Sequence, residues 1–253
     1  VEIMEKNRIA DLFAGWEETL IWSCLQDCMG RAFADSLENP RSAQILVGDF
    51  CFFAGQPDRE LAGFKPDWFS GDFVIMVPQD ARWADVIEKV YGERAKRVTR
   101  YAIKKDKNAF DRKRLEAMAG NVPPGYEVKL IDEAVYLQSR RENWARDFTA
   151  QYKSFEDYRC LGLGVVVLKD GMIVSGASSY SSYKCGIEVE IDTREDYRRK
   201  GLATICGARL VLECLNRGMY PSWDAQNLWS VGLAEKLGYH FSHEYDAYEI
   251  WGY

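Results

Sequence analysis

Apolar and acidic residues alternate over residues 186–193, where Ile187, Val189 and Ile191 are interleaved with three acidic residues. A period of two predicts a β-strand with one apolar and one acidic face. After a short basic turn, apolar residues recur at helical spacing over residues 204–215, which predicts a helix. A strand, a glycine-containing turn and a helix therefore follow one another directly.

The same periodicities predict the other elements of the C-terminal half. A hairpin is expected over residues 164–180, because Asp170 and Gly171 form a strong turn signal between two apolar runs. Further strands are expected at residues 126–132, 219–226, 239–244 and 248–251, and helices at residues 133–148 and 228–237. Residues 154–161 are expected to form either a helix or a loop.

The N-terminal half has a less regular pattern. An apolar stripe predicts helices over residues 2–34 with a break at Gly15. Strands are expected at residues 43–55, 72–78 and 98–104, and helices at residues 80–91 and 110–118. Two prolines and a glycine in residues 121–125 interrupt any regular element. They predict a boundary between an N-terminal α/β accessory region, residues 1–120, and a second domain, residues 121–253.

Composition indicates a globular chain, with 253 residues, 47% hydrophobic and 13% aromatic. The seven cysteines are an odd number and form no CxxC pair, which favours a reduced compartment. No apolar run approaches the roughly 18 residues of a membrane span. We therefore expect a cytoplasmic protein with no bound metal and no membrane partner, either a monomer or a homodimer.

Charge is unevenly distributed along the chain. Residues 82–114 contain twelve Lys or Arg and five Asp or Glu, although the net charge of the whole chain is −6. A basic run on an acidic protein can contact nucleic acid or the phosphates of a cofactor. Such a run is more often a solvated helix face, and we expect no nucleic-acid partner.

The turn at residues 198–204 has the features of an anion site. A glycine turn that opens a helix exposes unpaired backbone N–H groups, and the helix dipole adds positive potential. The sequence contains neither G-x-x-x-x-G-K-S/T nor G-x-G-x-x-G here, so a P-loop or dinucleotide fingerprint is excluded. The alternative is a solvated basic turn with no ligand.

Two motifs resemble those of the GNAT acyltransferase superfamily. Arg198-x-x-Gly201-x-Ala203 resembles its (Q/R)-x-x-G-x-(G/A) pyrophosphate loop, and residues 227–239 are similar to its N-x-x-(A/S)-x-x-L-Y-x-K-x-G-(F/Y) segment. The expected element order over residues 121–253 is also the superfamily's. The resemblance implies an α/β fold with a mixed, mostly antiparallel sheet flanked by helices. Residues 221–227 and the long N-terminal region resemble the zwittermicin-resistance group.

The resemblance implies acetyl-CoA as co-substrate and an N-acetyltransferase activity. It assigns cofactor contacts to the loop, the strand edge before it and the start of the last helix: Ile191, Thr193, Arg198, Arg199, Lys200, Gly201, Leu202, Ala203, Thr204, Asn227 and Ser230. Asn227 could instead simply cap its helix.

Glu188 and Glu190 are the candidate general bases, since both lie on the strand that approaches the thioester. The alternative is an acidic face that is solvated or attracts a cationic substrate. Ala234 stands where many relatives have a tyrosine that protonates the thiolate. Tyr239, Tyr245 or water could take that role.

We therefore expect an acetyl-CoA-dependent N-acetyltransferase that acts on a small amine, such as an aminated antibiotic or a polyamine. Acidic residues outside the basic run favour a cationic acceptor. One alternative is a catalytically inactive CoA-binding regulatory module, for which Ala234 is the best support. Another is an acyltransferase acting on a protein N-terminus or an aminoacyl-tRNA.

Overall fold

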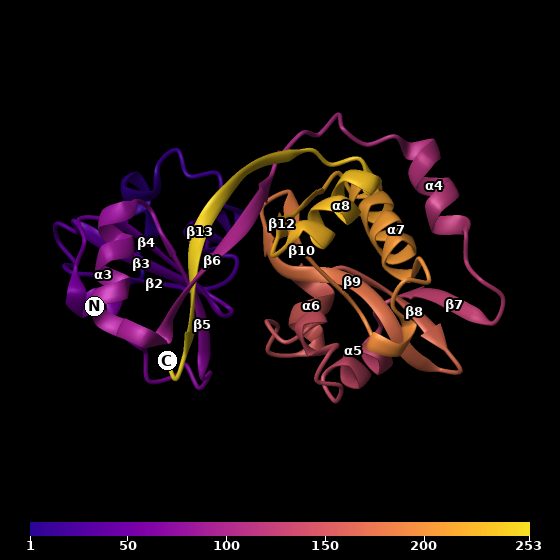
Figure 1. Ribbon diagram of the computed structural model, residues 1–253, viewed down its shortest axis with the longest axis horizontal. Helices are drawn as coiled ribbons and strands as arrows, with labels where there is room; N and C mark the ends of the chain where they lie inside the picture. The colour runs from indigo at the N-terminus through magenta and orange to yellow at the C-terminus, as the bar shows by residue number, and fades with distance from the viewer. The chain divides into compact units, whose positions relative to one another are not determined.

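The computed structural model describes all residues 1–253, which form two compact units (Figure 1). The first unit comprises residues 1–100 and 244–253, and the second comprises residues 101–243. Both are mixed α/β structures with mostly antiparallel sheets, as the sequence predicts. The expected boundary at residues 120/121 does not coincide with this division. Helix α4, Arg112–Gly120, packs against α7, Leu202–Asn216, inside the second unit.

The first unit is built on a sheet with the strand order β1-β2-β3-β4-β5-β13-β6. The pair β4 and β5 runs parallel, and the pairs β1–β2, β2–β3, β3–β4 and β5–β13 run antiparallel. The strands are β1 Glu2–Ile3, β2 Arg31–Ala34, β3 Ser42–Val47, β4 Phe50–Gly55, β5 Phe73–Pro78, β6 Ala95–Ile103 and β13 Phe241–Trp251. The helices are α1 Thr19–Leu25, α2 Arg59–Ala62 and α3 Ala81–Tyr91, and short 3₁₀ turns are η1 Lys6–Arg8, η2 Ala10–Phe13 and η3 Gly92–Arg94.

The helical prediction for residues 2–34 is largely wrong. Only α1 is an α-helix, and β2 occupies the end of this stretch. The chain leaves α1 through Asp27 and Gly30, both with positive φ (58° and 86°), a conformation that ends a helix. The apolar stripe before α1 instead belongs to 3₁₀ turns that place Ile9 and Phe13 in the core.

The second unit contains a five-stranded sheet in the order β11-β10-β9-β8-β7. Only β10 and β11 run parallel. Its strands are β7 Tyr126–Leu130, β8 Gly164–Lys169, β9 Met172–Tyr183, β10 Gly186–Thr193, β11 Tyr220–Ser222 and the short β12 Asp224–Ala225. Its further helices are α5 Glu133–Ser139, η4 Arg146–Phe148, α6 Phe155–Leu161, η5 Glu195–Tyr197 and α8 Leu228–Leu237.

Helix α7 forms the core of the second unit with one face of the sheet. Its residues Ile205 and Ala208 are buried in one cluster with Ile187 and Val189 of β10. Full burial of such a side chain stabilises a fold by roughly 1.5–3 kcal/mol. The predicted hairpin is confirmed, and Asp170 takes the positive φ (50°) that its turn requires.

Strands β6 and β13 each contribute residues to both units (Figure 1). In the first unit, β13 pairs with β5, and Glu249 of β13 forms an ion pair with Lys96 of β6. In the second unit, Ala102 of β6 pairs with Asp224 of β12. The two strands expected at residues 239–244 and 248–251 are thus one continuous strand. The basic run lies partly on β6, where acidic residues of β13 compensate its charge, and not only on a helix.

Candidate active site

Strand β10 places its two glutamates on the face of the sheet opposite α7. Ile187 and Val189 face α7, so the alternating Glu188 and Glu190 point the other way. Glu188 is only 6% exposed and Glu190 is half-buried. The pairing with β9 shifts register between Glu188 and Val189, which leaves Tyr180 as an extra residue on β9. A bulge of this kind increases the local twist of the sheet.

The parallel pairing between β10 and β11 ends early. Glu188 is the last β10 residue with a partner on β11, namely Ser222, although β10 continues to Thr193. From Val189 onward, β10 therefore has a strand neighbour only on its β9 side. An unpaired strand edge can accept an extended ligand through backbone hydrogen bonds.

The turn between β10 and α7 presents a row of backbone donors. Arg199 and Gly201 both have left-handed backbones, with φ values of 60° and 79°. No side chain caps α7 at Gly201, and the first N–H to find a helical acceptor is that of Ile205. The N–H groups of residues 199–204 donate to no protein acceptor. Successive N–H groups at a helix start form an anion-binding concavity.

The left-handed conformation of Arg199 is costly for a residue with a side chain. Such a conformation carries on the order of 1–3 kcal/mol of strain and is concentrated at ligand sites. Arg199 is exposed, so its guanidinium is accessible to a ligand at this turn.

The other two basic side chains of the turn make local contacts. Arg198 Nε donates to the carbonyl of Thr193 at 3.0 Å. Lys200 Nζ donates to the carbonyl of Asp196 at 3.1 Å and lies 4.4 Å from the centroid of the Tyr197 ring. These contacts tie the turn to the end of β10 and to η5, so both residues help to shape the loop.

Asp192 lies beside this turn and was not among the expected site residues. Its Oδ1 accepts a hydrogen bond from the N–H of Thr193 at 2.6 Å and lies 3.5 Å from Nη2 of Arg198. Burial raises the pKa of Asp192, and the Thr193 N–H and Arg198 oppose that rise. The only sequence signal for Asp192 is its place as the third acidic residue of the alternating strand.

The backbone of Thr193 is consequently engaged within the chain. Its N–H contacts Asp192 and its carbonyl contacts Arg198, while its hydroxyl lies 2.7 Å from the hydroxyl of Ser175. Ile191, the other expected edge residue, makes no backbone hydrogen bond outside its pairing with β9. The structure thus leaves the edge open at Ile191 and occupied at Thr193.

Asn227 and Ser230 form a small network at the start of α8. Oδ1 of Asn227 accepts from the N–H of Ser230 at 3.0 Å, which is an N-cap contact. The hydroxyl of Ser230 accepts from Nε1 of Trp223 at 3.0 Å. Trp223 is buried between β11 and β12, so the network joins the start of α8 to the strand segment where β11 has separated from β10.

Helix α8 contains no tyrosine, and Tyr239, just after it, is not available as an acid. Ala234 is fully buried in the core. Tyr239 donates its hydroxyl hydrogen to the carbonyl of Pro221 at 2.8 Å, and burial raises its pKa well above the ordinary value. Tyr239 therefore has a structural role. Tyr245 belongs to the first unit.

Three further polar side chains, those of Tyr183, Tyr220 and Ser222, lie near Glu188. Tyr183 Oη lies 3.4 Å from Oγ of Ser222, the residue paired with Glu188. Burial raises the pKa of Tyr220 to about 12, and the charge of Glu188 adds to this rise. Sequence reasoning missed these residues, because their proximity depends on the parallel register of β10 and β11.

Comparison with known proteins decides the family. A model of the GNAT acetyltransferase family matches residues 10–248. The chain belongs to this family. The match includes most of the N-terminal region, so family membership extends well beyond the half of the chain that carries the two motifs.

Individual relatives agree with this assignment. A GCN5-related N-acetyltransferase-like protein from Streptococcus suis 89/1591 is 46% identical, with 98% of each chain covered and a TM-score of 0.92. The N-acetyltransferase YdfB of Bacillus subtilis strain 168, described as uncharacterised, is 29% identical over 241 residues, 91% of this chain and 89% of YdfB. A GCN5-related N-acetyltransferase from Kribbella flavida shares the fold at 14% identity, with 98% and 95% coverage and a TM-score of 0.54.

The family assignment makes this chain an N-acetyltransferase that acts on some acceptor. None of its helices combines the length and apolar character that a transmembrane span requires.

Proposed function

We propose that this GNAT protein transfers the acetyl group of acetyl-CoA to a small, positively charged amine. The observation that carries the proposal is the row of unpaired backbone N–H groups at residues 199–204, directly beside the open edge of β10. The two features together suit a ligand with a pyrophosphate at one end and an extended amide chain at the other.

The turn would hold the pyrophosphate. Backbone N–H groups from Arg199 to Thr204 supply the donors, including those of Lys200, Leu202 and Ala203, and α7 supplies the positive end of a 15-residue helix. Arg199 would add its accessible positive charge. Arg198 and Lys200 would act mainly by holding the loop, since their side chains are bound to neighbouring carbonyls.

The pantetheine arm would follow the open edge of β10. Backbone pairing at Ile191 requires no particular side chain. Pairing at Thr193 would replace its contacts with Asp192 or Arg198. Asn227 and Ser230 would approach the arm from the start of α8, with Trp223 fixing the orientation of the Ser230 hydroxyl.

Glu188 is the better placed of the two candidate bases. It lies at the last paired position of β10 and β11, where the strands begin to separate. Glu190 lies two residues further along the same face and is more exposed. A base must reach the amine proton directly or through one water, so Glu188 would deprotonate the amine and Glu190 would attract its charge.

The acetyl thioester supplies the activated acyl group when acetyl-CoA is bound. The chain's own contribution is orientation of the two substrates and removal of the amine proton. Ala234 provides no acid for the departing thiolate, and Tyr239 is committed to Pro221. Protonation from solvent suffices in this scheme, because a thiolate is a stable leaving group.

The cofactor turn can be tested with the two glycines that flank α7, Gly201 and Gly218. Gly201→Glu puts an acidic side chain at the proposed pyrophosphate site. Because each lost charge-assisted hydrogen bond costs about 1.5–3 kcal/mol, we expect the Kd for CoA to rise at least about 100-fold. The measurement is isothermal titration calorimetry with CoA, followed by an acetylation assay with a library of amines.

Gly218→Glu is the matched control. Gly218 follows the other end of α7 and, like Gly201, has a positive φ (67° against 79°) and open space around its Cα. Both variants therefore carry a similar backbone strain. Equal CoA affinity in the Gly201 and Gly218 variants would show that the pyrophosphate site has been assigned to the wrong place.

A CoA-binding regulatory module is the competing function, and the buried Ala234 is the observation in its favour. Mass spectrometry after incubation with acetyl-CoA and the amine library separates the two. Acetylated product supports the transferase. Tight CoA binding without product over a broad range of acceptors, including peptides with free N-termini, supports the regulatory module.

A further inference from the structure

The first unit repeats the order of strands and helices of the second, except that the single helix α1 stands where the second unit has α5 and α6. In the second unit the chain runs β7, α5, α6, β8, β9, β10, α7, β11 and α8, with β10 and β11 parallel. In the first unit it runs β1, α1, β2, β3, β4, α2, β5 and α3, with β4 and β5 parallel. In both units the remaining pairs among these strands are antiparallel.

The outer strands also correspond. In the first unit β5 is followed across the sheet by β13 and then β6. In the second unit the chain continues from β11 into β12, and β12 pairs with β6. The N–H of Lys104, just after β6, donates to the carbonyl of His240, just before β13. Strand β6 thus pairs with residues of both units, beside β13 in the first and beside β12 in the second. The position equivalent to β10 and its turn is therefore β4 with residues 55–58.

The strand edge that is open along β10 in the second unit is closed along the equivalent strand, β4, in the first unit. The N–H of Gln79 donates to the carbonyl of Phe53 at 3.0 Å, which extends the parallel ladder past the end of β5. The side chain of Gln79 then accepts from the N–H of Gly55 at 3.0 Å, and Nε1 of Trp83 donates to the carbonyl of Gly55 at 3.0 Å. Both backbone groups of Gly55 are thus satisfied within the unit.

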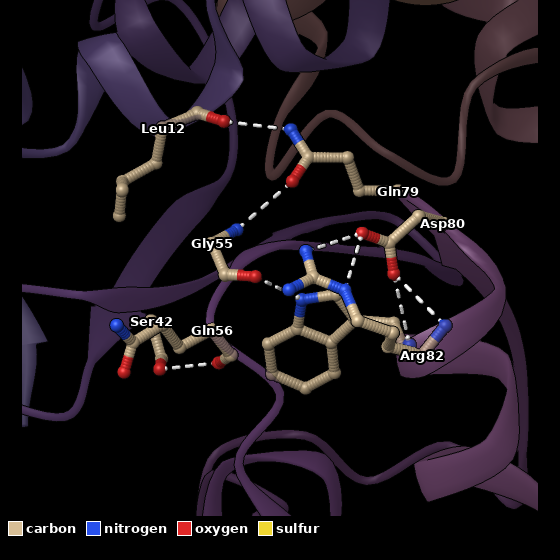
Figure 2. Close-up of polar contacts among 8 residues, drawn as sticks. Leu12, Ser42, Gly55, Gln56, Gln79, Asp80 and Arg82 are labelled. Carbon is tan, nitrogen blue, oxygen red and sulfur yellow. Dashed lines mark hydrogen bonds and ion pairs between the residues drawn. The ribbon is translucent and has the colours of Figure 1, made fainter.

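Figure 2 shows how Gln79 bridges this position. Its amide nitrogen donates to the carbonyl of Leu12 at 2.8 Å while its amide oxygen holds Gly55. The hydroxyl of Ser42 bonds to the carbonyl of Gln56 just beyond. Trp83 is fully buried with its ring 5.1 Å from that of Phe53. An extended ligand would have to break several of these contacts to pair with β4.

The helix start that corresponds to the cofactor turn is shorter and is capped by a side chain. Helix α2 has four residues, against 15 in α7. The carboxylate of Asp58 accepts from the N–H of Leu61 at 2.9 Å, and Pro57 has no N–H to offer. A capping carboxylate satisfies the donors and repels a second anion.

We propose that the first unit is a second copy of the same fold, in which Gln79, Trp83 and Asp58 close the position equivalent to the proposed cofactor site. Each chain then binds a single CoA, in the second unit. This inference rests on the proposed function of the turn at residues 199–204. The first unit then acts as the partner that completes the fold and has no binding role for CoA.

Calorimetric titration of the full chain with CoA tests the inference through stoichiometry. We expect one CoA per chain in the wild type, no measurable binding in Gly201→Glu, and one CoA with affinity within about twofold of wild type in Asp58→Gly. Glycine replaces an aspartate cap at a cost of only a few tenths of a kcal/mol, so the Asp58 variant remains folded.

Two CoA per chain, or weaker CoA binding in Asp58→Gly, would overturn the inference while leaving the turn at residues 199–204 as a site. A single CoA that persists in Gly201→Glu, or no binding in the wild type, would overturn the inference together with the proposed function. The Gly218→Glu variant is the control and should bind one CoA. That result would show that Gly201→Glu loses CoA binding through a change at the turn itself and not through unfolding.

Discussion

At the scale of single residues, the two glutamates of β10 differ in position although the sequence makes them equivalent. The alternation predicts a shared face, and the packing of Ile187 and Val189 on α7 places both carboxylates opposite that helix. The residue at which β11 separates from β10 depends on strand pairing. The alternation of apolar and acidic residues gives no information on that pairing. Glu188 is at that point and Glu190 is beyond it.

This difference predicts separate kinetic effects. Glu188→Gln removes the proposed base, so kcat should fall by about 10²–10⁴-fold and the acidic limb of the pH–rate profile should disappear. Glu190→Gln should mainly raise KM for a cationic amine. Steady-state kinetics over a range of pH provide the measurement. If neither variant loses activity, neither glutamate is the base.

Asp192 predicts a pH-dependent change in stability. Burial raises its pKa above the unfolded value, so its stabilising contribution is fully present below the unfolded pKa and is lost as pH rises through the folded pKa. Asp192→Asn cannot ionise and avoids that loss. The unfolding free energy of the variant relative to wild type should therefore increase from about pH 3 to about pH 7.

Urea unfolding at both pH values measures this difference, and Asp196→Asn serves as the control. The hydrogen bond from Arg194 lowers the pKa of Asp196, so the wild-type residue contributes stability above its unfolded pKa that is lost as pH falls. The relative stability of the control variant should change in the opposite direction. If the difference in unfolding free energy between Asp192→Asn and the wild type stays constant with pH, burial does not raise the pKa of Asp192 as assigned.

At the scale of elements, periodicity predicts long regular segments and fails for short ones. The strand at residues 186–193 and the helix after it are confirmed as β10 and α7, because each buries a full apolar face. The expected helix at residues 133–148 ends at Ser139. There the hydroxyl of Ser139 bonds to the carbonyl of Tyr136 and contacts Thr149, which turns the chain.

Only part of the candidate site could be predicted from the sequence. The turn at residues 198–204 could be found from its glycine, its basic residues and the helix after it. Local contacts were not predictable, such as Trp223 to Ser230 or Arg198 to Thr193. They depend on side-chain directions that follow from the twist and register of the sheet, and a one-dimensional pattern carries neither.

At the scale of the whole molecule, the sequence predicts strands but not their partners. Residues 98–104 and 239–251 were expected as strands that belong to separate domains. In the structure β6 and β13 each run through both units. The sheet of the first unit includes β13 from the C-terminal half of the chain, and β12 of the second unit pairs with β6 from the N-terminal half.

Shared strands predict a single cooperative unfolding transition. Met76→Ala in the first unit and Leu210→Ala in the second each remove a fully buried side chain, at a cost of about 2–5 kcal/mol. Both variants should lower the midpoint of the same transition. Differential scanning calorimetry provides the measurement, with Met4→Ala, at an exposed position, as a control of unchanged midpoint.

Two resolved transitions, with each variant shifting only one of them, would show that the units fold independently. Coincident shifts would mean that a fragment limited to residues 121–253 lacks part of its own fold, since β6 supplies the strand next to β12.

The exchange of β6 and β13 also bears on the origin of the chain. In the first unit β13, from the C-terminal half, lies between β5 and β6, and in the second unit β6, from the N-terminal half, pairs with β12. If the halves descend from one shorter gene, its product had a final strand too long for its own sheet. Two copies of that ancestor would have traded strand ends as a swapped homodimer. In that case gene fusion would have made the exchange permanent, and one of the two ancestral sites would have been free to close.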